Sequence, residues 1–345
     1  MNPRIGRLRA ALEEPLLLTN PTNILYLCGF RSSNAALLVD QDRARLFTDF
    51  RYSEAARAVE GVDFQETKRA LLADLADRLS GPIGFEADFV SYAGYETLRD
   101  GSIEPVPRRG LVEGLRAVKD ADELAAITRA CEITDRVFER LVEQPFVGRT
   151  ERDVSWTIEQ LFHDEGADAV AFETIVASGP NSARPHGRAT DRQIGRGETV
   201  IVDTGCIVSG YASDYTRTFT TGLVEGPIKE AYALVLAAQQ AGLDALRAGV
   251  RGVDADAAAR AVVDATAFAG TFGHGLGHGL GLEVHEAPRL SVESKDTLAA
   301  GNVVTVEPGI YLEGRAGIRI EDNVVITDDS VQNLTGFRKD LITVT

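Results

Sequence analysis

The stretch that decides the fold reads ETVIVDTGCIVSGYASDYTRTFT and covers residues 198–220. Two apolar runs flank a short turn at residues 208–210, a pattern that predicts an antiparallel β-hairpin. Asp203 and Asp214 lie symmetrically about that turn, so we expect their side chains to be opposed or within one register step of it. The Cβ atoms of opposed residues are about 4.5–5.5 Å apart. Two carboxylates this close repel each other, which predicts a positive charge between them.

A second stretch, NVVTVEPGIYLEGRAGIRIEDNVVIT at residues 302–327, repeats this arrangement. Its turn, EGRAG, contains Gly314, and Glu307 and Glu321 are equally distant from that glycine. Acids on a half-exposed strand would alternate with apolar residues. Asp203 instead follows VIV and Glu307 follows VTV, so both are expected to be buried. The two hairpins therefore predict a buried cluster of carboxylates.

The third stretch, GHGLGHGLGLEVHE at residues 273–286, alternates glycine with other residues. On a strand these glycines would share one face and let another backbone or a ligand approach closely. His274 and His278 would then lie on the opposite face. The spacing does not match GxGxxG, so it does not predict a dinucleotide or phosphate loop. Neutral imidazole is a common ligand of divalent metals, which makes His278 a candidate ligand and leaves the role of His274 open.

Four carboxylates and one imidazole form a donor set made mostly of oxygen. Such a donor set indicates a site for two ions such as Mn²⁺, Co²⁺, Fe²⁺ or Zn²⁺ rather than a zinc site built from thiolates. Two metal ions about 3.5–4 Å apart can activate a water molecule and polarise a carbonyl group. The residues therefore predict a site for two divalent metal ions.

Composition limits the partners of the chain. Its 345 residues carry a net charge of −16 and include 3 cysteines. A chain this acidic is repelled by nucleic acid and by anionic lipid, so we expect neither a nucleic-acid nor a membrane partner. Cysteines without CxxC spacing are typical of a reducing compartment. The N-terminal stretch also lacks the apolar run of about 7–15 residues of a secretory signal, so we expect a cytoplasmic protein.

Length predicts about two domains. The segment PVPRRGLVEGLRAVKD is rich in proline, glycine and charge, and we place the boundary near its Gly114, which gives domains at 1–114 and 115–345. NAALLVD followed by ARLFTD predicts a hairpin in a small α/β domain. In the second domain, helices grouped beside antiparallel hairpins predict an α+β fold. The expected helices cover residues 121–143, 150–165, 227–247 and 252–270.

The helix expected at residues 150–165 carries two further predictions. Thr150 and Asp153 have the spacing of a capping box, in which each side chain accepts from the other residue's backbone. Trp156 is the only tryptophan of the chain. We expect it to contact the core, because large aromatic side chains contribute much of the apolar area that folding buries.

Several of these motifs together resemble a known family, the M24 metallopeptidases with the pita-bread fold. The carrying motifs are VDTG, SDYTRTF, GHGLGLEVHE, VEPGIY and RIEDNVVI. The nearest group is that of the Xaa-Pro dipeptidases (prolidases) and Xaa-Pro aminopeptidases. NPTNILYLCGF and LFTDFRY resemble the smaller N-terminal domain of the creatinase and prolidase group. By this resemblance the metal ligands are Asp203, Asp214, His278, Glu307 and Glu321.

The resemblance also implies roles for residues outside the ligand set. His186, in SGPNSARPHGRAT, matches a histidine that binds the substrate or the oxyanion. His285 matches a second histidine that stabilises the tetrahedral intermediate. Glu307 is implied as the proton shuttle as well as a ligand. Arg289 matches a position that binds the substrate's carboxylate in prolidases, and Arg319 is expected to orient carboxylates through paired hydrogen bonds.

The implied activity is dinuclear, metal-dependent hydrolysis of the Xaa-Pro bond in dipeptides. The resemblance implies two divalent ions per subunit, with Mn²⁺ first and Co²⁺ or Zn²⁺ as alternatives. It implies a proline-containing dipeptide or short peptide as substrate, and a homodimer. The preferred N-terminal residue stays open.

Other activities within and beyond the family stay open to different degrees. An Xaa-Pro aminopeptidase, which releases the first residue of longer peptides, is the main alternative. A methionine aminopeptidase would share the ligands but would not need the N-terminal domain, and a creatinase would lack the metal set. A non-catalytic pita-bread binding module is the remote alternative, since such modules typically lose ligands.

Overall fold

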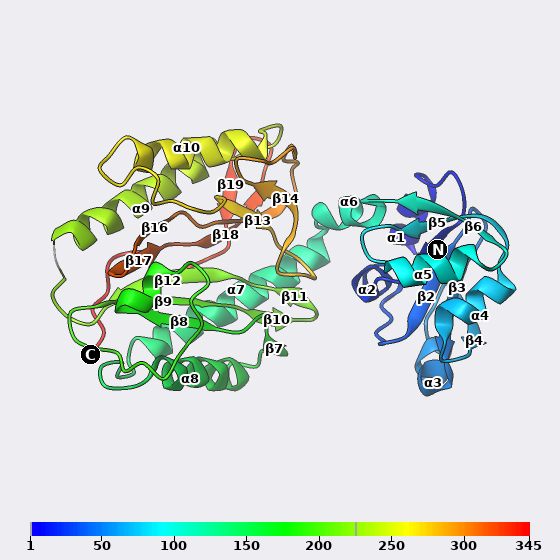
Figure 1. Cartoon of the computed structure of the whole chain (residues 1–345), viewed down its shortest axis with the longest axis horizontal. Helices are drawn as coiled ribbons and strands as arrows, with labels where there is room; N and C mark the ends of the chain where they lie inside the picture. Colours follow the sequence, from blue (N-terminus) through cyan, green and yellow to red (C-terminus); the bar gives the residue numbers. More distant parts are fainter. Residues whose placement is uncertain (1, 225) are drawn as a thin grey trace. The chain divides into compact units, whose positions relative to one another are not determined.

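The computed structural model describes residues 2–224 and 226–345, which form two compact units. The first extends to residue 116 and the second begins at residue 117 (Figure 1). The boundary expected at Gly114 lies inside helix α6 (Leu111–Ala117), close to this division. Each unit has a hydrophobic core of its own. No helix in the described ranges is long and apolar enough to cross a membrane.

The first unit is built on a six-stranded mixed sheet with the order β4-β3-β2-β1-β5-β6. The hairpin expected within residues 34–49 is confirmed as the antiparallel pair β2 and β3, whereas β5 and β6 pair in parallel. The strands are β1 (Leu16–Leu18), β2 (Ala35–Val39), β3 (Ala44–Asp49), β4 (Asp63–Thr67), β5 (Gly81–Glu86) and β6 (Ile103–Arg108). The helices preceding α6 are α1 (Pro3–Arg9), α2 (Pro21–Cys28), α3 (Ser53–Arg57), α4 (Leu71–Arg78) and α5 (Tyr92–Arg99), with a 3-10 turn at Phe50–Tyr52.

The second unit places two pairs of helices around antiparallel strands. These are α7 (Ala121–Leu141) with α8 (Glu151–Asp164), and α9 (Gly226–Ala245) with α10 (Gly252–Asp264). The capping box predicted at Thr150 and Asp153 is confirmed at the start of α8. The prediction for Trp156 is wrong: its side chain is 60% exposed, because α8 turns Val154, Ile158 and Phe162 to the core instead.

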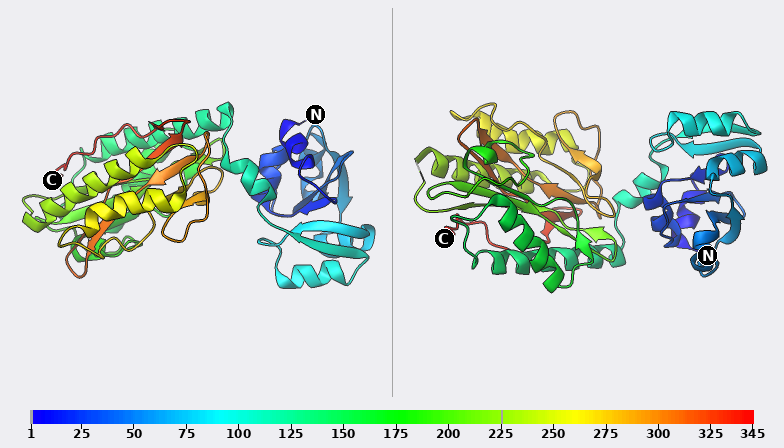
Figure 2. Two further views of the ribbon diagram at one scale, coloured as in Figure 1. Left: turned by 90° about the horizontal axis from the view of Figure 1, so that it is seen from above. Right: turned by 60° about the horizontal axis from the view of Figure 1, so that its bottom comes forward.

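The strands of the second unit form short antiparallel sheets between these helix pairs (Figures 1 and 2). Helices α7 and α8 share a core with one sheet, β12-β9-β8, and α9 and α10 share a core with the larger sheet, β14-β13-β15-β18-β19. The remaining sheets are β11-β10-β7 and β16-β17. The expected α+β organisation is confirmed. The strands are β7 (Ala169–Val170), β8 (Ile175–Ser178), β9 (Thr199–Thr204), β10 (Cys206–Val208), β11 (Tyr211–Ala212), β12 (Tyr215–Thr220), β13 (Gly277–Gly279), β14 (Glu286–Leu290), β15 (Val303–Val306), β16 (Gly309–Leu312), β17 (Ala316–Arg319), β18 (Asp322–Ile326) and β19 (Val331–Asn333).

The first hairpin has a slightly different register from the symmetric one. Strand β9 pairs Asp203 with Thr216, so Asp214 is its diagonal neighbour rather than its direct partner. The reason lies in the turn, where Ser209 and Gly210 both have positive φ, as a two-residue hairpin turn requires. Diagonal residues still lie on one face, within about 7–8 Å, so the two aspartates remain neighbours.

The second hairpin has the predicted register. Val306 pairs with Asp322 in β15 and β18, and Gly309 pairs with Arg319 in β16 and β17. Both ladders are therefore symmetric about Gly314. This places Glu307 and Glu321 opposite each other in the gap between the two ladders.

The glycine-rich stretch contains only one short strand, β13. A Cβ atom added to Gly277 would overlap the carbonyl oxygen of Thr305, and one added to Gly279 would overlap that of Ala287. A third close approach lies in the first hairpin, where a Cβ atom on Gly205 would overlap the carbonyl oxygen of Ser213. The close backbone approach expected for the glycine-rich stretch is confirmed, and it brings β13 between β14 and β15.

Candidate metal centre and substrate cavity

A cavity of about 360 Å³ in the second unit collects the residues singled out from the sequence. Side chains from β9, β13 and β17 and from the residues next to β12, β15 and β18 converge on it. Its walls include Asp203, Asp214, His278, Glu307 and Glu321, the complete expected ligand set. They also include His186, His285, Arg289, Arg319 and His274.

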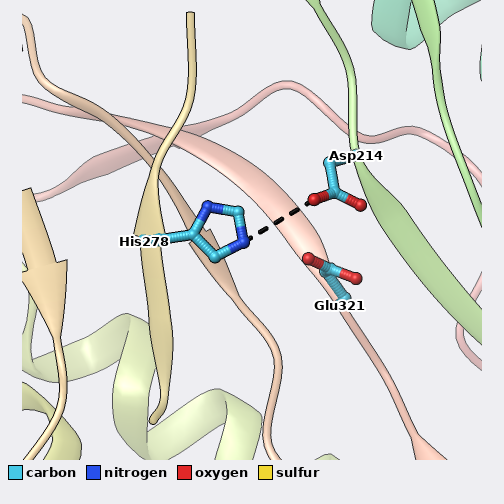
Figure 3. A group of neighbouring side chains, drawn as sticks. All are labelled: Asp214, His278 and Glu321. Carbon is cyan, nitrogen blue, oxygen red and sulfur yellow. Dashed lines mark ion pairs between the residues drawn. The ribbon is translucent and has the colours of Figure 1, made fainter. Parts of the chain in front are cut away.

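The candidate ligand atoms lie close together. Atoms of Asp214, His278 and Glu321 all fall within 4.8 Å of one another (Figure 3). His278 Nε2 is 3.6 Å from Asp214 Oδ2 and 3.3 Å from Glu307 Oε1. Such separations leave room for cations between the groups, because carboxylate and imidazole ligands bind ions such as Zn²⁺ at about 2.0–2.2 Å.

The imidazole of His278 is oriented by its own strand. Its Nδ1 atom is 3.1 Å from the carbonyl oxygen of Gly279, and its backbone N–H donates to Thr305 Oγ1 at 3.0 Å. A proton on Nδ1 satisfies that carbonyl and leaves the lone pair of Nε2 facing the carboxylates. The hydroxyl of Thr305 in turn donates to Glu307 Oε1 at 3.2 Å, so one threonine aligns two candidate ligands.

Arg319 is the positive charge predicted next to the first acidic pair. Its Nη2 donates to Asp203 Oδ2 at 2.5 Å, and its Nε donates to Thr216 Oγ1 at 3.0 Å. The hydroxyl of Thr216 then donates to Glu321 Oε2 at 2.7 Å. The second oxygen, Asp203 Oδ1, is buried and has no hydrogen-bond partner within residues 2–224 and 226–345. A buried acceptor of this kind calls for a partner that the protein does not supply, such as a cation.

Burial perturbs the ionisation of this cluster. It raises the pKa of Asp214 and of Glu321 well above their usual ranges, and neighbouring carboxylates add to the effect. Burial also raises the pKa of Glu307 to about 8, although Arg319 acts in the opposite direction. The pKa of His278 falls to about 4, chiefly through burial and then through His285. A buried group of acids with so little positive charge around it fits divalent cations, which bind the ionised acids and the neutral imidazole.

His186, His285 and Arg289 lie on the same cavity but are exposed. The ring of His285 is centred 4.3 Å from that of His278. Partial burial in the cavity, and then nearby Arg289, lower the pKa of His285. Arg289, on β14, is the cross-strand partner of His278. Within the described parts of the chain its guanidinium has no acidic or hydrogen-bonding partner, so it is available to an anionic group in the cavity.

Both ring nitrogens of His274 are engaged by groups other than the candidate ligands. Its Nδ1 is 2.8 Å from the carbonyl oxygen of Gly275, and its Nε2 is 3.0 Å from the hydroxyl of Tyr311. That hydroxyl also accepts from Arg319 Nη1 at 2.8 Å. Burial lowers the pKa of His274 to about 4, so the ring is neutral and accepts from Tyr311. Its contacts join it to the Arg319 network rather than to the carboxylates.

Some residues of the site were not identified from the sequence. Thr216 and Tyr311 lie inside the quoted motifs SDYTRTF and VEPGIY, and their polar side chains on otherwise apolar strands were an available signal. Thr305 carried the same signal. Phe172 and Ile175, which form part of the cavity wall, carry no such signal, because an apolar side chain near a strand predicts only core packing.

The cavity and its donor set define a metal-dependent hydrolase, and comparison with known proteins specifies the family. The family described as metallopeptidase family M24 matches residues 125–328, and the creatinase/prolidase N-terminal domain matches residues 4–118. The chain belongs to metallopeptidase family M24. The two-domain pita-bread architecture that the motifs implied is thereby confirmed, and membership of this family implies divalent metal ions.

Individual relatives cover nearly the whole chain. A Xaa-Pro dipeptidase of Pyrococcus furiosus is 32% identical over 99% of this chain and 100% of its own length. The structure of a Xaa-Pro dipeptidase from Bacillus anthracis has a TM-score of 0.95 and 36% identity, covering 99% of both chains. The structure of an X-Pro aminopeptidase from Thermotoga maritima has a TM-score of 0.89 and 34% identity, covering 99% of this chain and 100% of its own.

Proposed function

We propose that this metallopeptidase is a prolidase, a Xaa-Pro dipeptidase that hydrolyses the bond before proline in dipeptides. The observation that carries the proposal is the free guanidinium of Arg289, which lies across from His278 on the cavity wall. A guanidinium binds a carboxylate through two parallel hydrogen bonds. The C-terminal carboxylate of a dipeptide lies one residue beyond the scissile bond, within reach of a cation beside the metal centre. Relatives that carry the name Xaa-Pro dipeptidase support this choice.

We further propose that two divalent ions, Mn²⁺ first and Co²⁺ or Zn²⁺ as alternatives, occupy the cluster. Asp203, Asp214, His278, Glu307 and Glu321 would hold them. When bound, such ions supply an activated water molecule and polarise the scissile carbonyl. A donor set made mostly of oxygen, with one imidazole, supports Mn²⁺, and the buried unpartnered oxygen of Asp203 supports a cation there.

The protein's own side chains then perform the remaining steps. Arg289 holds the substrate's carboxylate and so places the scissile carbonyl over the carboxylate cluster. Glu307 takes a proton from the attacking water and returns it to the proline nitrogen as the bond breaks. His186 and His285, both on the cavity wall, donate hydrogen bonds to the negative charge that develops on the carbonyl oxygen.

The dimensions of the cavity support short substrates. Its volume of about 360 Å³ is near the lower end of the range of about 300–1,000 Å³ that is typical of ligand pockets. Phe172, Ile175 and Val284 provide an apolar wall that suits the proline ring, and the substrate's free amino group is expected near a metal or near Asp203. Peptides with blocked N-termini should therefore be poor substrates.

The test is a product assay on Ala-Pro beside Ala-Pro-Ala, with the metal-stripped protein reloaded with Mn²⁺, Co²⁺ or Zn²⁺. A prolidase cleaves Ala-Pro much faster than Ala-Pro-Ala. The reverse preference would favour a Xaa-Pro aminopeptidase, the activity named for the similar Thermotoga maritima structure. Absence of bound or activating metal, measured by mass spectrometry, would favour the non-catalytic binding module.

Three further parts of the assignment are proposals as well. Residues 1–114 would form the creatinase/prolidase-like domain and residues 115–345 the catalytic domain. The protein would act as a homodimer, which light scattering on the purified protein tests. It would act in the cytoplasm, an assignment supported by the free state of Cys28, Cys131 and Cys206, since reducing compartments keep thiols unpaired.

A further inference from the structure

Glu151, the first residue of α8, is a buried carboxylate that lies outside the cavity. Its side chain has no exposed surface, and it is not part of the cavity wall. A buried carboxylate is costly unless hydrogen bonds satisfy its oxygens. Among the described residues, every hydrogen bond to the Glu151 side chain comes from one segment, residues 178–190, which begins at the last residue of β8 and carries His186. Arg192, just beyond this segment, adds a nearby positive charge.

The contacts of Glu151 reach both ends of that segment and Asn181 near its start. Oε1 accepts from the backbone N–H of Ser178 at 2.7 Å and from its hydroxyl at 2.8 Å. Oε2 accepts from Asn181 Nδ2 at 2.8 Å. It also accepts from the backbone N–H of Thr190 at 3.0 Å and from its hydroxyl at 2.7 Å. The Glu151 side chain therefore holds the two ends of the loop and Asn181 close together.

His186 depends on this loop for its position. Within the described residues its own ring makes no hydrogen bond to the protein. The backbone around it is held indirectly: Asn181 Nδ2 donates to the carbonyl of Arg188 at 3.1 Å, and Arg319 Nη1 donates to the carbonyl of Pro185 at 3.0 Å. The same amide of Asn181 bonds to Glu151, so the carboxylate fixes the inner side of the turn that presents His186.

We propose that Glu151 is a positioning residue for catalysis, which acts by shaping the loop at residues 178–190 and thereby placing His186 over the cavity. The inference rests on the proposed function, because it takes His186 to act on the substrate. Misplacing a catalytic group by about 1 Å can cost about 10²-fold in rate. Glu151 itself touches neither the candidate metal ligands nor the cavity.

The substitution Glu151→Gln probes this arrangement with almost no change in volume. Each oxygen of Glu151 accepts from a backbone N–H, that of Ser178 on one side and that of Thr190 on the other. Whichever way the amide of a glutamine is turned, its NH₂ group must face one of these N–H donors. One end of the loop is therefore released in either orientation.

Asp135→Asn is the matched control. Asp135 accepts from the hydroxyl of Tyr215 at 2.6 Å and from the backbone N–H groups of Gly336 and Phe337 at 2.9 Å and 2.8 Å. Like Glu151 it is a helix carboxylate that ties down a distant segment through backbone N–H groups, but residues 336–337 do not belong to the cavity wall. Its other partner, Tyr215, follows the candidate ligand Asp214, so metal content is measured on this variant as well. Asp135→Asn therefore shows how the enzyme behaves when a hydrogen-bonded helix carboxylate is lost and stability falls, but His186 keeps its position.

The experiment measures steady-state kinetics on Ala-Pro, metal content and amide hydrogen exchange for the holoenzyme and its variants. We expect Glu151→Gln to lower kcat between ~10-fold and ~100-fold, with KM and metal content almost unchanged. In a His186→Ala background the same substitution should cost no more than about 2-fold, because the group it positions is already gone. Asp135→Asn should leave kcat near the wild-type value.

Other results would overturn the proposal. An equal loss of kcat with and without His186, a loss of metal in Glu151→Gln, or the same loss in Asp135→Asn would mean a general structural role. If Glu151→Gln does not fold, Thr190→Val removes one hydroxyl contact and should give a smaller loss with the same dependence on His186. Hydrogen exchange separates this inference from the prolidase assignment: faster exchange confined to residues 178–190 is expected even if Ala-Pro is not the substrate, and unchanged exchange there would refute the positioning role.

Discussion

The cavity has two regions that differ in burial and in how they are held. The first is the buried floor, made of Asp203, Asp214, His278, Glu307 and Glu321, in which the exposed fractions of Asp203, Asp214 and Glu321 are 9%, 5% and 1%. The second is the exposed rim, made of His186, His285 and Arg289. Floor side chains come from paired strands or from their immediate ends, whereas His186 and His285 come from loops and Arg289 from the edge strand β14.

This difference separates two tasks. The floor is fixed by strand register and by hydrogen bonds from Thr216, Thr305 and Arg319, which hold ligands in place before anything binds. The side chains of the rim lack such support: among the residues described, the guanidinium of Arg289 and the ring of His186 make no hydrogen bond to the protein. We expect the floor to determine metal content and the rim to determine how substrate is held. The following substitutions test that division.

The largest effect is expected on the floor. Asp214→Asn or Glu321→Gln replaces an anionic ligand by a neutral and poorer one, so activity should be abolished and metal content should fall. Mass spectrometry of the purified variants and assays at saturating metal measure both. Wild-type turnover in either variant would contradict the two-hairpin metal site.

His285→Ala tests the rim at its catalytic part. The variant should keep its metals and lose about 10²–10³-fold in kcat, the usual cost of removing one donor to a developing oxyanion. Metal content and kcat are measured on the same preparation. If metal is lost together with activity, His285 belongs to the floor and the division between the regions fails there.

Arg289→Lys tests the substrate-binding part of the rim. Lysine keeps the charge but not the planar fork of donors. We expect KM for Xaa-Pro dipeptides to rise roughly 10- to 100-fold. This corresponds to a loss of about 1.5–3 kcal/mol of binding free energy, the range for charged hydrogen bonds. Turnover of Xaa-Pro-Xaa should change much less. Equal losses on dipeptide and tripeptide would remove the main support for a dipeptidase.

Thr216→Val gives the smallest expected effect and sharpens the description of the floor. It removes the hydroxyl that joins Arg319 to Glu321 while keeping the side chain's shape. A hydrogen bond to a charged group contributes about 1.5–3 kcal/mol, and because the charge of Glu321 stays in place we expect the lower end of that range, a weakening of metal affinity of about 10-fold. Calorimetric titration of the metal-stripped protein measures this. Unchanged affinity would mean that strand register alone orients Glu321.

The floor was largely predictable from the sequence because hairpin symmetry links residue number to position. This worked fully for Glu307 and Glu321, where both ladders are symmetric about Gly314. It was less accurate for Asp203 and Asp214, because the two-residue turn at Ser209 and Gly210 moved the register. Which turn forms depends on local φ values, which the pattern of apolar residues does not encode.

The rim could not be reached in this way. In our proposal the loop position of His186 depends on Glu151, and helix α8, strands β7 and β8 and the 3-10 turn at Gly179–Ala183 separate the two residues in the chain. Tertiary contacts of that kind leave no periodic signal, and only the family resemblance pointed to His186. Trp156 shows the same limit from another side: amphipathic spacing favoured Val154 and Ile158 for the core, and the size of the indole did not override it.

The close backbone approach at Gly205, Gly277 and Gly279 has a consequence for anyone who maps this protein by saturation mutagenesis. Any side chain at these positions would overlap a carbonyl oxygen of a neighbouring backbone segment, so every amino-acid substitution there should inactivate the enzyme. In an activity screen these three positions would tolerate as few substitutions as the metal ligands do, although glycine has no side chain that could take part in the reaction. Sensitivity to substitution alone would therefore assign too many residues to the active site. Only a parallel screen for folded protein would distinguish residues that take part in the reaction from glycines that allow two backbone segments to approach.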